Sequence, residues 1–508
     1  MQKIRNSCWS GPLLSGILTF IAVCQINFWC SWICYVPVFI SIAHATPKLA
    51  LRKGFLFGAT IALLAFFWMI PGAKRFTGHS MLYGFGVMIL SLIFLALYHA
   101  VVLWLFALLR KQGNTSGLLL RNGLLLSSLM CMFEAALMTV SEGLPWFDEH
   151  AGSGLTENLY AIQPASVFGI YILSFVVVLV NYLLASLINA GRYRRIWIPV
   201  SIVICYLSTG FIMFTNFKAP EDSNKFTAAI LAQNIRPEMR WDENTGDMLV
   251  QKLIDLNKTA ATLKPNLMLW SESGIPWNYD QNDELVKEVL RITKPSQAVH
   301  VLGINTAYRN NEIFNSAYCI LPDGKAMARY DKQRLLAFIE KPINGMIVPF
   351  SSSNGIIERS NTNYAAPLNT PFGKAGILIC NESAVPGAAA SMVNQGAGFL
   401  LNMSNDGWFN DTYIVRDHYY TARLRAVESR KDLVINSNNG YSGLIKASGE
   451  TEMMKRSEEP FVEIVTVQPN AYTTLASSYP MIFIYACSLC LLIITIVNRY
   501  RYFRFRHD

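Results

Sequence analysis

Three residues in the polar middle of the chain stand at the ends of predicted strands and carry groups that could perform acyl transfer. Glu272 follows Leu-Met-Leu-Trp-Ser, Lys332 follows Ala-Arg-Tyr-Asp, and Cys380 follows Ile-Leu-Ile. A thiolate is a strong nucleophile, and a carboxylate can take the thiol proton. A lysine ammonium can stabilise the oxyanion of a tetrahedral intermediate, where one fixed donor contributes about 3 kcal/mol. The set therefore predicts an acyl-transfer site that needs no histidine.

Each of these residues also has an ordinary structural interpretation. A free cysteine is often a small buried hydrophobic residue, and a charge at a strand end is often solvated. Cys319 is the other cysteine of the polar region, which has no CxxC pair combined with a second pair or with histidine. Neither a disulfide framework nor a zinc site is therefore predicted, and no cofactor or metal is expected. His418 is the one histidine among motif-like residues, so a Cys-His pair is the weaker alternative.

Alternating strands and helices are predicted to position these groups. Apolar, β-rich segments at 226–235, 265–273, 298–308, 373–380 and 399–406 predict strands, and 315–332 predicts a hairpin around Pro322-Asp323-Gly324. Apolar residues at helical spacing predict helices at 244–263 and 283–293, and 382–397 is a helical connection. This alternation predicts an α/β layered fold, and its chemistry is expected where strands end.

The chain as a whole has the composition of a membrane protein. Of 508 residues 52% are hydrophobic and only 15% are charged, against about 25% in soluble chains. The net charge is +9, but the basic residues cluster at the ends of the apolar segments and form no basic face on the polar region. Nucleic acid is therefore not an expected partner. Eight apolar segments predict membrane helices: Leu13–Cys24, Phe28–Ile42, Gly54–Ile70, Met81–Leu109, Leu124–Val140, Ser166–Ile188, Trp197–Met213 and Met481–Val497.

The first two apolar segments are short and predict a hairpin of two helices. A cleaved signal peptide is the alternative, because Ala43-His-Ala45 resembles a cleavage site. Two apolar segments precede that site and basic residues follow it, which favours retained membrane helices.

The distribution of basic residues predicts the orientation. Basic residues gather at both termini and in alternate loops: Lys3, Arg5, Lys48, Arg52, Lys53, Arg110, Lys111, Arg121, Arg192, Arg194, Arg195, Arg499, Arg501, Arg504 and Arg506. Only Lys74 and Arg75 break the pattern among the short loops. The positive-inside rule places both termini in the cytoplasm. We therefore expect seven spans within 1–218, an outer domain at 219–470, and an eighth span with a basic tail at 471–508.

Glu134 is predicted to lie within the fifth span. An intramembrane carboxylate is costly and indicates either a functional site or a hydrogen bond between helices. Both interpretations remain open at this stage.

Longer motifs resemble the nitrilase superfamily and, together with the flanking spans, the apolipoprotein N-acyltransferase family. The motifs are residues 269–276, 330–340, 380–383, 400–409 and 422–443, and residues 133–147 of the membrane part. The resemblance covers nearly the whole chain. It implies an αββα sandwich with Glu272 as base, Lys332 as oxyanion partner and Cys380 as nucleophile. It also implies supporting roles for Glu340 and Glu382, and a substrate entrance shaped by Trp241, Asn315 and Trp408.

The resemblance further implies a two-step reaction at a bacterial inner membrane, with the catalytic domain on the periplasmic face. Cys380 would take an acyl chain from a phospholipid as a thioester. The amine of the diacylglyceryl-cysteine at a lipoprotein's N-terminus would then accept it, and a monomer is expected. One alternative is a membrane-tethered amidase that uses water as the acceptor. The other is a transporter or scaffold with a degenerate domain, which the complete Glu-Lys-Cys set disfavours.

The sequence departs from the family pattern at three places. These departures affect the expected shape of the lid over the site and the expected preference for the acyl donor. The family's Trp-Pro-Glu is Trp270-Ser271-Glu272 here, and its Pro-Phe-Gly before the acid is Ala337-Phe338-Ile339. The aromatic residue that commonly follows the nucleophile is Asn381. Trp408 and Phe409 could form an apolar lid or belong to the core.

Overall fold

The computed structural model describes residues 9–72, 81–141, 147, 150–218, 225–236, 239, 241–242, 244–309, 312–336, 340, 357–409 and 412–507. Some predictions fall on residues outside these ranges, namely those for Lys3, Arg5, Lys74, Arg75 and the loop Ala337–Ile339. The side chain of Trp408 and the side chains beyond residue 497 also lie outside the described part.

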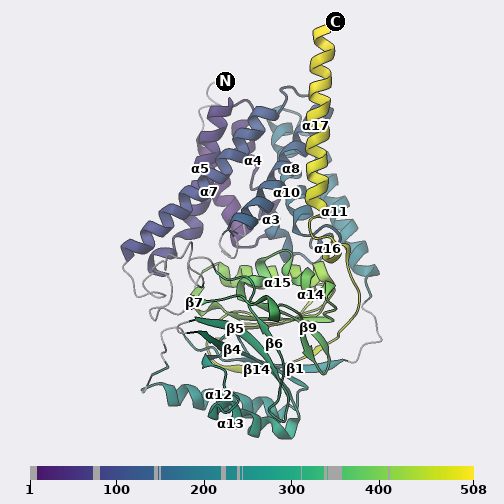
Figure 1. Cartoon of the computed structure of the whole chain (residues 1–508). Helices are drawn as coiled ribbons and strands as arrows, with labels where there is room; N and C mark the ends of the chain where they lie inside the picture. The colour runs from purple at the N-terminus through teal and green to yellow at the C-terminus, as the bar shows by residue number, and fades with distance from the viewer. Residues whose placement is uncertain are drawn as a thin grey trace.

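The apolar segments form a helical bundle, drawn above the sheets in Figure 1. Its helices are α2 (Ser10–Thr19) with its π-helical extension η1 (Phe20–Cys24), α3 (Phe28–Ser31), α4 (Val36–Ile42), α5 (Pro47–Phe66), α7 (Met81–Leu109), α8 (Ser116–Val140), α9 (Ala165–Phe168), α10 (Ile170–Asn189), α11 (Trp197–Asn216) and α17 (Ile482–His507). The C-terminal end of α17 lies at the end of the bundle remote from the sheets (Figure 1).

Five helices in the described ranges are long and apolar enough to cross a membrane. They are α5, α7, α8, α10 and the segment 193–216 that contains α11. Three shorter apolar segments, 10–24, 28–42 and 482–497, coincide with the other predicted spans. At 1.5 Å per residue, 15 residues cover about 23 Å of a hydrocarbon core that is about 30 Å thick. The membrane bundle is therefore confirmed, whereas the number of eight spans stays a prediction.

Close helix contacts in the bundle depend on small residues. Gly54 and Gly58 lie on one face of α5 against α7, where an added Cβ would come within 2.7 Å of the His99 carbonyl oxygen and 2.8 Å of the Leu95 carbonyl oxygen. Without a hydrophobic driving force between helices in lipid, such backbone contact is a main source of packing energy. The pair explains why α5 and α7 lie against each other over much of their length.

The polar region forms two sheets packed face to face (Figure 1). One sheet has the order β14-β1-β2-β4-β5-β6, with β3 beside β4 and β7 beside β5. Its strands are β1 (Phe226–Ala232), β2 (Leu267–Leu269), β3 (Ile275–Asn278), β4 (Val299–Arg309), β5 (Glu312–Ile320), β6 (Ala326–Asp331), β7 (Ile357–Glu358) and β14 (Phe461–Val467). The other sheet has the order β13-β12-β11-β10-β9-β8. It contains β8 (Leu368–Thr370), β9 (Gly373–Ile379), β10 (Phe399–Asn405), β11 (Leu433–Asn438), β12 (Ser442–Ile445) and β13 (Thr451–Lys455).

Helices cover the outer face of each sheet, which gives four layers. Apolar residues of both sheets, such as Ile230, Leu269 and Ile377, fill the space between them. Helices α12 (Gly246–Thr262) and α13 (Glu284–Thr293) pack on the first sheet, and α14 (Ala388–Asn394) and α15 (Ile414–Ser429) pack on the second. The predicted layered α/β sandwich is therefore confirmed.

Helix α15 lies between the sandwich and the membrane helices (Figure 1). Arg423 donates to the carbonyl oxygens of Thr156 at 2.9 Å and Glu157 at 2.8 Å, and also to that of Gly449 at 2.8 Å. Arg416 donates to the Glu157 carboxylate at 2.9 Å. Two arginines one heptad apart thus fix the sandwich to the segment that connects α8 with α9.

Candidate active site

Strand direction brings the predicted reactive residues together. Strands β2 and β4 are parallel, and β6 also runs with them because β5 is antiparallel to both of its neighbours. Glu272 and Lys332 follow the C-terminal ends of β2 and β6. In the second sheet, β9 and β10 are parallel, and Cys380 directly follows β9. The carboxyl ends of parallel strands meet at one edge, where loops can converge.

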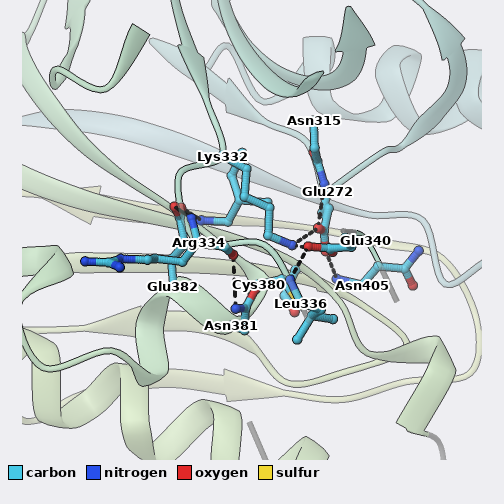
Figure 2. Close-up of polar contacts among 12 residues, drawn as sticks. Glu272, Asn315, Lys332, Arg334, Leu336, Glu340, Cys380, Asn381, Glu382 and Asn405 are labelled. Carbon is cyan, nitrogen blue, oxygen red and sulfur yellow. Dashed lines mark hydrogen bonds and ion pairs between the residues drawn. The ribbon is translucent and has the colours of Figure 1, made fainter. Parts of the chain in front are cut away.

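The Glu272 carboxylate is held by three donors (Figure 2). Its Oε1 accepts from Asn315 Nδ2 at 2.9 Å and from Lys332 Nζ at 3.2 Å, and its Oε2 accepts from the Asn405 N–H at 3.0 Å. The Glu272 side chain is only 8% exposed and the Lys332 side chain is fully buried. The predicted base is therefore desolvated and fixed in orientation.

Glu340 is the second carboxylate on the ammonium. Its Oε1 lies 2.6 Å from Lys332 Nζ, and its Oε2 accepts from the Leu336 N–H at 2.7 Å. Burial raises the pKa of Glu340, while the Lys332 ammonium beside it opposes that rise. Burial lowers the pKa of Lys332, but Glu272 and Glu340 together hold it well above its ordinary value. The lysine is therefore a fixed positive charge.

Cys380 lies beside these groups at the start of a tight turn (Figure 2). The turn is the 3₁₀ segment η7 (Cys380–Ala384), and the φ of Cys380 is +51°. This left-handed conformation is unfavourable for a residue with a Cβ and persists only where the surroundings impose it. Strand β9 ends at Ile379, so the strained residue directly joins a buried strand to the turn. The turn redirects the chain at the thiol.

The resting thiol is protonated. Burial and the Glu272 charge raise the pKa of Cys380 well above its ordinary value, although the Lys332 ammonium opposes this. Nucleophilic attack therefore requires a base that removes the proton as the bond forms. Of the two carboxylates bonded to Lys332, Glu272 has the larger effect on the pKa of the Cys380 thiol.

Glu382 connects the cysteine turn to the lysine loop. Its carboxylate accepts from the backbone N–H of Ile379 at 2.8 Å, Gln333 at 2.7 Å and Arg334 at 3.1 Å, and from the Tyr330 hydroxyl at 2.8 Å. The two residues after Lys332 are thereby fixed to the residue before Cys380. The supporting role expected for Glu382 stays a prediction, and these contacts give it a route to Lys332 through the backbone.

Two further predicted residues, Glu134 and Trp241, lie in different parts of the molecule. Glu134 is buried in α8, where it accepts from the Ala151 N–H at 2.9 Å and lies 3.0 Å from His150 Nδ1. Its partners thus belong to the segment after α8 and not to another long helix. Trp241 packs edge to face on Trp277, in the core beneath α12 and α13. Its role at a substrate entrance stays a prediction.

The surroundings of Phe409, His418 and Cys319 bear on the alternative interpretations of these residues. Phe409 is buried in the core shared with the membrane helices and contacts Trp68, which favours the core interpretation. Trp408 follows β10 in the short helix η8 (Asp406–Phe409). His418 Nδ1 lies 2.8 Å from Asp406, and no hydrogen bond between described residues joins it to Cys380. Burial raises the pKa of Cys319 to about 12.

Sequence reasoning did not identify several groups that complete the site. The N–H groups of Leu336 and Asn405 bind carboxylates, and any residue type could supply them. Tyr330 begins the motif at 330–340, but only the fold brings its hydroxyl to Glu382. The described residues contain no group of three His, Cys, Asp or Glu side chains arranged to hold a metal ion.

Comparison with known proteins gives first the class of the catalytic domain. The family model described as carbon-nitrogen hydrolase matches residues 227–454, which comprise nearly the whole sandwich. A second family model, described as the apolipoprotein N-acyltransferase N-terminal domain, matches residues 15–183 of the bundle. The chain thus joins a domain of the carbon-nitrogen hydrolase class to a membrane bundle that matches the N-terminal domain of apolipoprotein N-acyltransferases.

Whole-length relatives identify the family. An apolipoprotein N-acyltransferase of Geobacter metallireducens is 26% identical over 90% of this chain and 88% of its own length. One from Methylococcus capsulatus is 25% identical over 80% and 79%, and one from Pseudomonas syringae is 24% identical over 88% and 89%. The chain belongs to the apolipoprotein N-acyltransferase family, whose members are acyltransferases.

Proposed function

We propose that this protein transfers an acyl chain from a phospholipid to the N-terminal amine of a diacylglyceryl-cysteine lipoprotein through a thioester on Cys380. The family membership supports lipoprotein N-acylation. The observation that carries the finer proposal is the cluster of Glu272, Lys332 and Glu340 beside a protonated thiol. This arrangement supplies a base, a nucleophile and a fixed positive charge within one buried site.

In the first step the Cys380 sulfur attacks the carbonyl carbon of the phospholipid ester while Glu272 takes the thiol proton. The negative charge that develops on the carbonyl oxygen is stabilised by Lys332, whose position Glu340 fixes. The intermediate then collapses and the ester C–O bond breaks. The departing lysophospholipid oxygen takes the proton from Glu272, which leaves a thioester and an ionised base.

In the second step the lipoprotein amine attacks the thioester carbonyl. Glu272 removes a proton from the amine, and the C–S bond breaks as the amide forms. The cysteine sulfur recovers the proton, so the enzyme returns to its first state. A thioester suits this exchange because it reacts readily with amines, and the amide product is more stable.

The membrane bundle explains how a buried site receives lipid. Both substrates carry acyl chains, and exposing a chain to water costs about 0.8 kcal/mol per CH₂ group. Helix α15 fixes the sandwich to the bundle through Arg416 and Arg423, which supports a catalytic domain held against the membrane helices. We propose that acyl chains enter sideways from the bilayer.

We propose the orientation from the basic residues of the loops. Units 1–218 and 471–508 would form the membrane part with both termini in the cytoplasm, and 219–470 would face the periplasm. The C-terminal end of α17 lies at the end of the bundle remote from the sheets, which supports a cytoplasmic C-terminus (Figure 1). The protein would act as a monomer, and Glu134 would stabilise the bundle end nearest the catalytic domain.

Reconstitution distinguishes transfer from hydrolysis. The purified chain in phospholipid vesicles is given a peptide that begins with diacylglyceryl-cysteine, and the products are analysed by mass spectrometry. The proposal predicts N-acylated peptide and lysophospholipid in equal amounts. Free fatty acid without N-acylated peptide would contradict it and would support an amidase-like enzyme that uses water.

A further inference from the structure

The strand that leads to the lysine of the site carries a second polar group on its opposite face. Along β6, Tyr330 lies in the core between the sheets, and Lys332 follows the strand into the site. Successive side chains of a strand point to opposite faces, so Arg329 and Asp331 lie on the outer face of the first sheet. The Asp331 side chain is nevertheless fully buried there. No step of the proposed reaction uses this acid.

The Asp331 carboxylate is bound by three donors. Arg329 Nε donates to Oδ1 at 2.6 Å and Arg329 Nη2 donates to Oδ2 at 2.6 Å, which makes a bidentate pair. Ser316 Oγ donates to Oδ1 at 2.7 Å. Hydrogen bonds between charged groups are about twice as strong as neutral ones, and the planar guanidinium also fixes the orientation of the carboxylate. The last residue of β6 is therefore held rigidly.

Aromatic rings hold the Arg329 guanidinium in place. Its central carbon lies 5.2 Å from the centroid of the Phe314 ring and 5.8 Å from that of the Tyr318 ring, both on β5. The same carbon lies 4.5 Å from the centroid of Tyr364, at the end of the short helix η6 (Thr362–Tyr364). The arginine side chain is only 16% exposed, and cation–π contacts are stronger at desolvated sites. The rings therefore confine the guanidinium while the carboxylate orients it.

This outer group is connected directly to the site. Ser316 is opposite Asp331 in the antiparallel pairing of β5 with β6. The next residue on each strand belongs to the site: the Lys332 N–H donates to the Asn315 carbonyl oxygen at 2.8 Å, and the Asn315 amide donates to Glu272 at 2.9 Å. Figure 2 shows the side chains of Asn315 and Lys332 directed at Glu272. A shift of Asp331 against Ser316 would therefore move the lysine against the base.

The reaction depends on the exact position of the lysine. A misplacement of about 1 Å can cost about 100-fold in rate, even when a change far from the reacting atoms causes it. The lysine side chain is a flexible chain of four carbons, so its ammonium can be placed accurately only if its backbone is fixed. The Arg329–Asp331 pair fixes that backbone from the outer face of the sheet.

We propose that the Arg329–Asp331 pair, together with Ser316, positions Lys332 for the reaction by fixing the end of β6 from the face opposite the site. These three are positioning residues that act through the lysine. The inference rests on the proposed function, in which Lys332 acts beside Cys380. The alternative is that the pair only stabilises the fold.

Two conservative substitutions break the pair in different ways. Asp331→Asn removes the negative charge, and Arg329→Lys keeps the positive charge but loses the planar fork. Each should slow the maximal rate of acyl-enzyme formation by about fivefold to tenfold, part of the loss expected for a hydrogen bond to a charged group. The phospholipid concentration that gives half the maximal rate should change by less than about twofold, because the lysine acts in the transition state. A stabilising role alone would lower the unfolding midpoint and leave the rate of the folded protein unchanged.

A double-mutant cycle tests whether the pair acts through Lys332. The readout is alkylation of the Cys380 peptide by iodoacetamide, with the full chain in vesicles of ether-linked phospholipid, which has no ester to react. The Lys332 ammonium opposes the rise in the pKa of the Cys380 thiol, so its displacement should slow alkylation. Asp331→Asn should therefore slow alkylation by about threefold or more in the parent, but by less than about 1.5-fold when Lys332→Met is also present.

The matched control is an exposed pair with the same geometry. On α13, Glu288 accepts from Arg291 Nε at 2.7 Å and from Arg291 Nη2 at 2.6 Å, and the two side chains are 36% and 72% exposed. Glu288→Gln makes the same change from acid to amide. Both rates should stay within about twofold of the parent, because exposed pairs contribute little.

The outcomes separate this inference from the proposed function. Parent rates for folded Asp331→Asn and Arg329→Lys would overturn the inference. Equal slowing of alkylation with and without Lys332→Met would also overturn it, because the pair would then not act through the lysine. Ser316→Ala removes only one of the three donors and replaces Asp331→Asn in the cycle if that variant does not fold. Absence of acyl-enzyme in the parent, with the cycle as predicted, would instead refute the phospholipid reaction and leave the inference standing.

Discussion

Removal of the Glu340 carboxylate is expected to change the position of the Lys332 ammonium. Lys332 Nζ lies 2.6 Å from Glu340 and 3.2 Å from Glu272, so the shorter bond keeps the ammonium partly away from the base. In Glu340→Ala the ammonium loses that partner and moves toward Glu272. The base then becomes a poorer proton acceptor, and the oxyanion partner is misplaced.

The magnitude follows from burial and charge. Lys332 is fully buried and the Glu340 side chain is 11% exposed, so the bond is poorly screened by water. One hydrogen bond to a charged group contributes about 1.5–3 kcal/mol, which corresponds to roughly 10- to 150-fold in rate. The assay is single-turnover formation of the acyl-enzyme, followed by intact mass, with thermal unfolding as the check on folding.

A matched control is available on the surface of the sandwich. Lys455 and Glu463 also lie 2.6 Å apart, but their side chains are 42% and 36% exposed. Glu463→Ala should therefore change the acylation rate by less than about twofold, since exposed pairs contribute little. A Glu340→Ala rate within about threefold of the parent would refute the reasoning and leave Glu340 as a dispensable acid.

Three further predictions follow from the same geometry. Glu272→Gln and Lys332→Met should each reduce thioester formation by at least about 100-fold, because one removes the proton acceptor and the other the oxyanion partner; acylation at the parent rate in either would exclude its role. Glu382→Gln should lower the midpoint of thermal unfolding by several degrees, since its amide nitrogen would face backbone N–H donors. An unchanged midpoint would count against the role of Glu382 in holding the cysteine turn to the lysine loop. Reporter fusions at Gly398 and Asp508 should report opposite sides of the membrane, with Gly398 outside; the same side for both would contradict the orientation.

Local sequence patterns were sufficient for the elements with strong periodicity. The strand predicted at 399–406 corresponds to β10 at Phe399–Asn405, and the helix at 283–293 corresponds to α13 at Glu284–Thr293. Cys380, Glu272 and Lys332 were placed at strand ends because a short, clearly bounded segment typical of a strand precedes each of them. These features depend on neighbours in the chain, which a sequence shows directly.

Other features depend on contacts between distant segments. The two-residue strand β7 has too little pattern to be recognised, yet the Glu358 N–H at its end donates to the carbonyl oxygen of Glu340. The Asn405 N–H binds Glu272 across 133 residues, and backbone donors leave no trace in residue type. Helix α15 has a weak apolar stripe because it packs on sheet and bundle at once, so its arginines were not recognised as an interface.

The most direct test of the account is the mass of the protein after exposure to phospholipid. The full chain and its Cys380→Ala and Cys319→Ala variants are incubated in vesicles without an acceptor, and intact masses and digested peptides are compared. The account predicts one added acyl chain on the Cys380 peptide, removable by neutral hydroxylamine, in the parent and in Cys319→Ala but not in Cys380→Ala. An acyl group on another residue, or full N-acylation of a lipopeptide by Cys380→Ala, would contradict it.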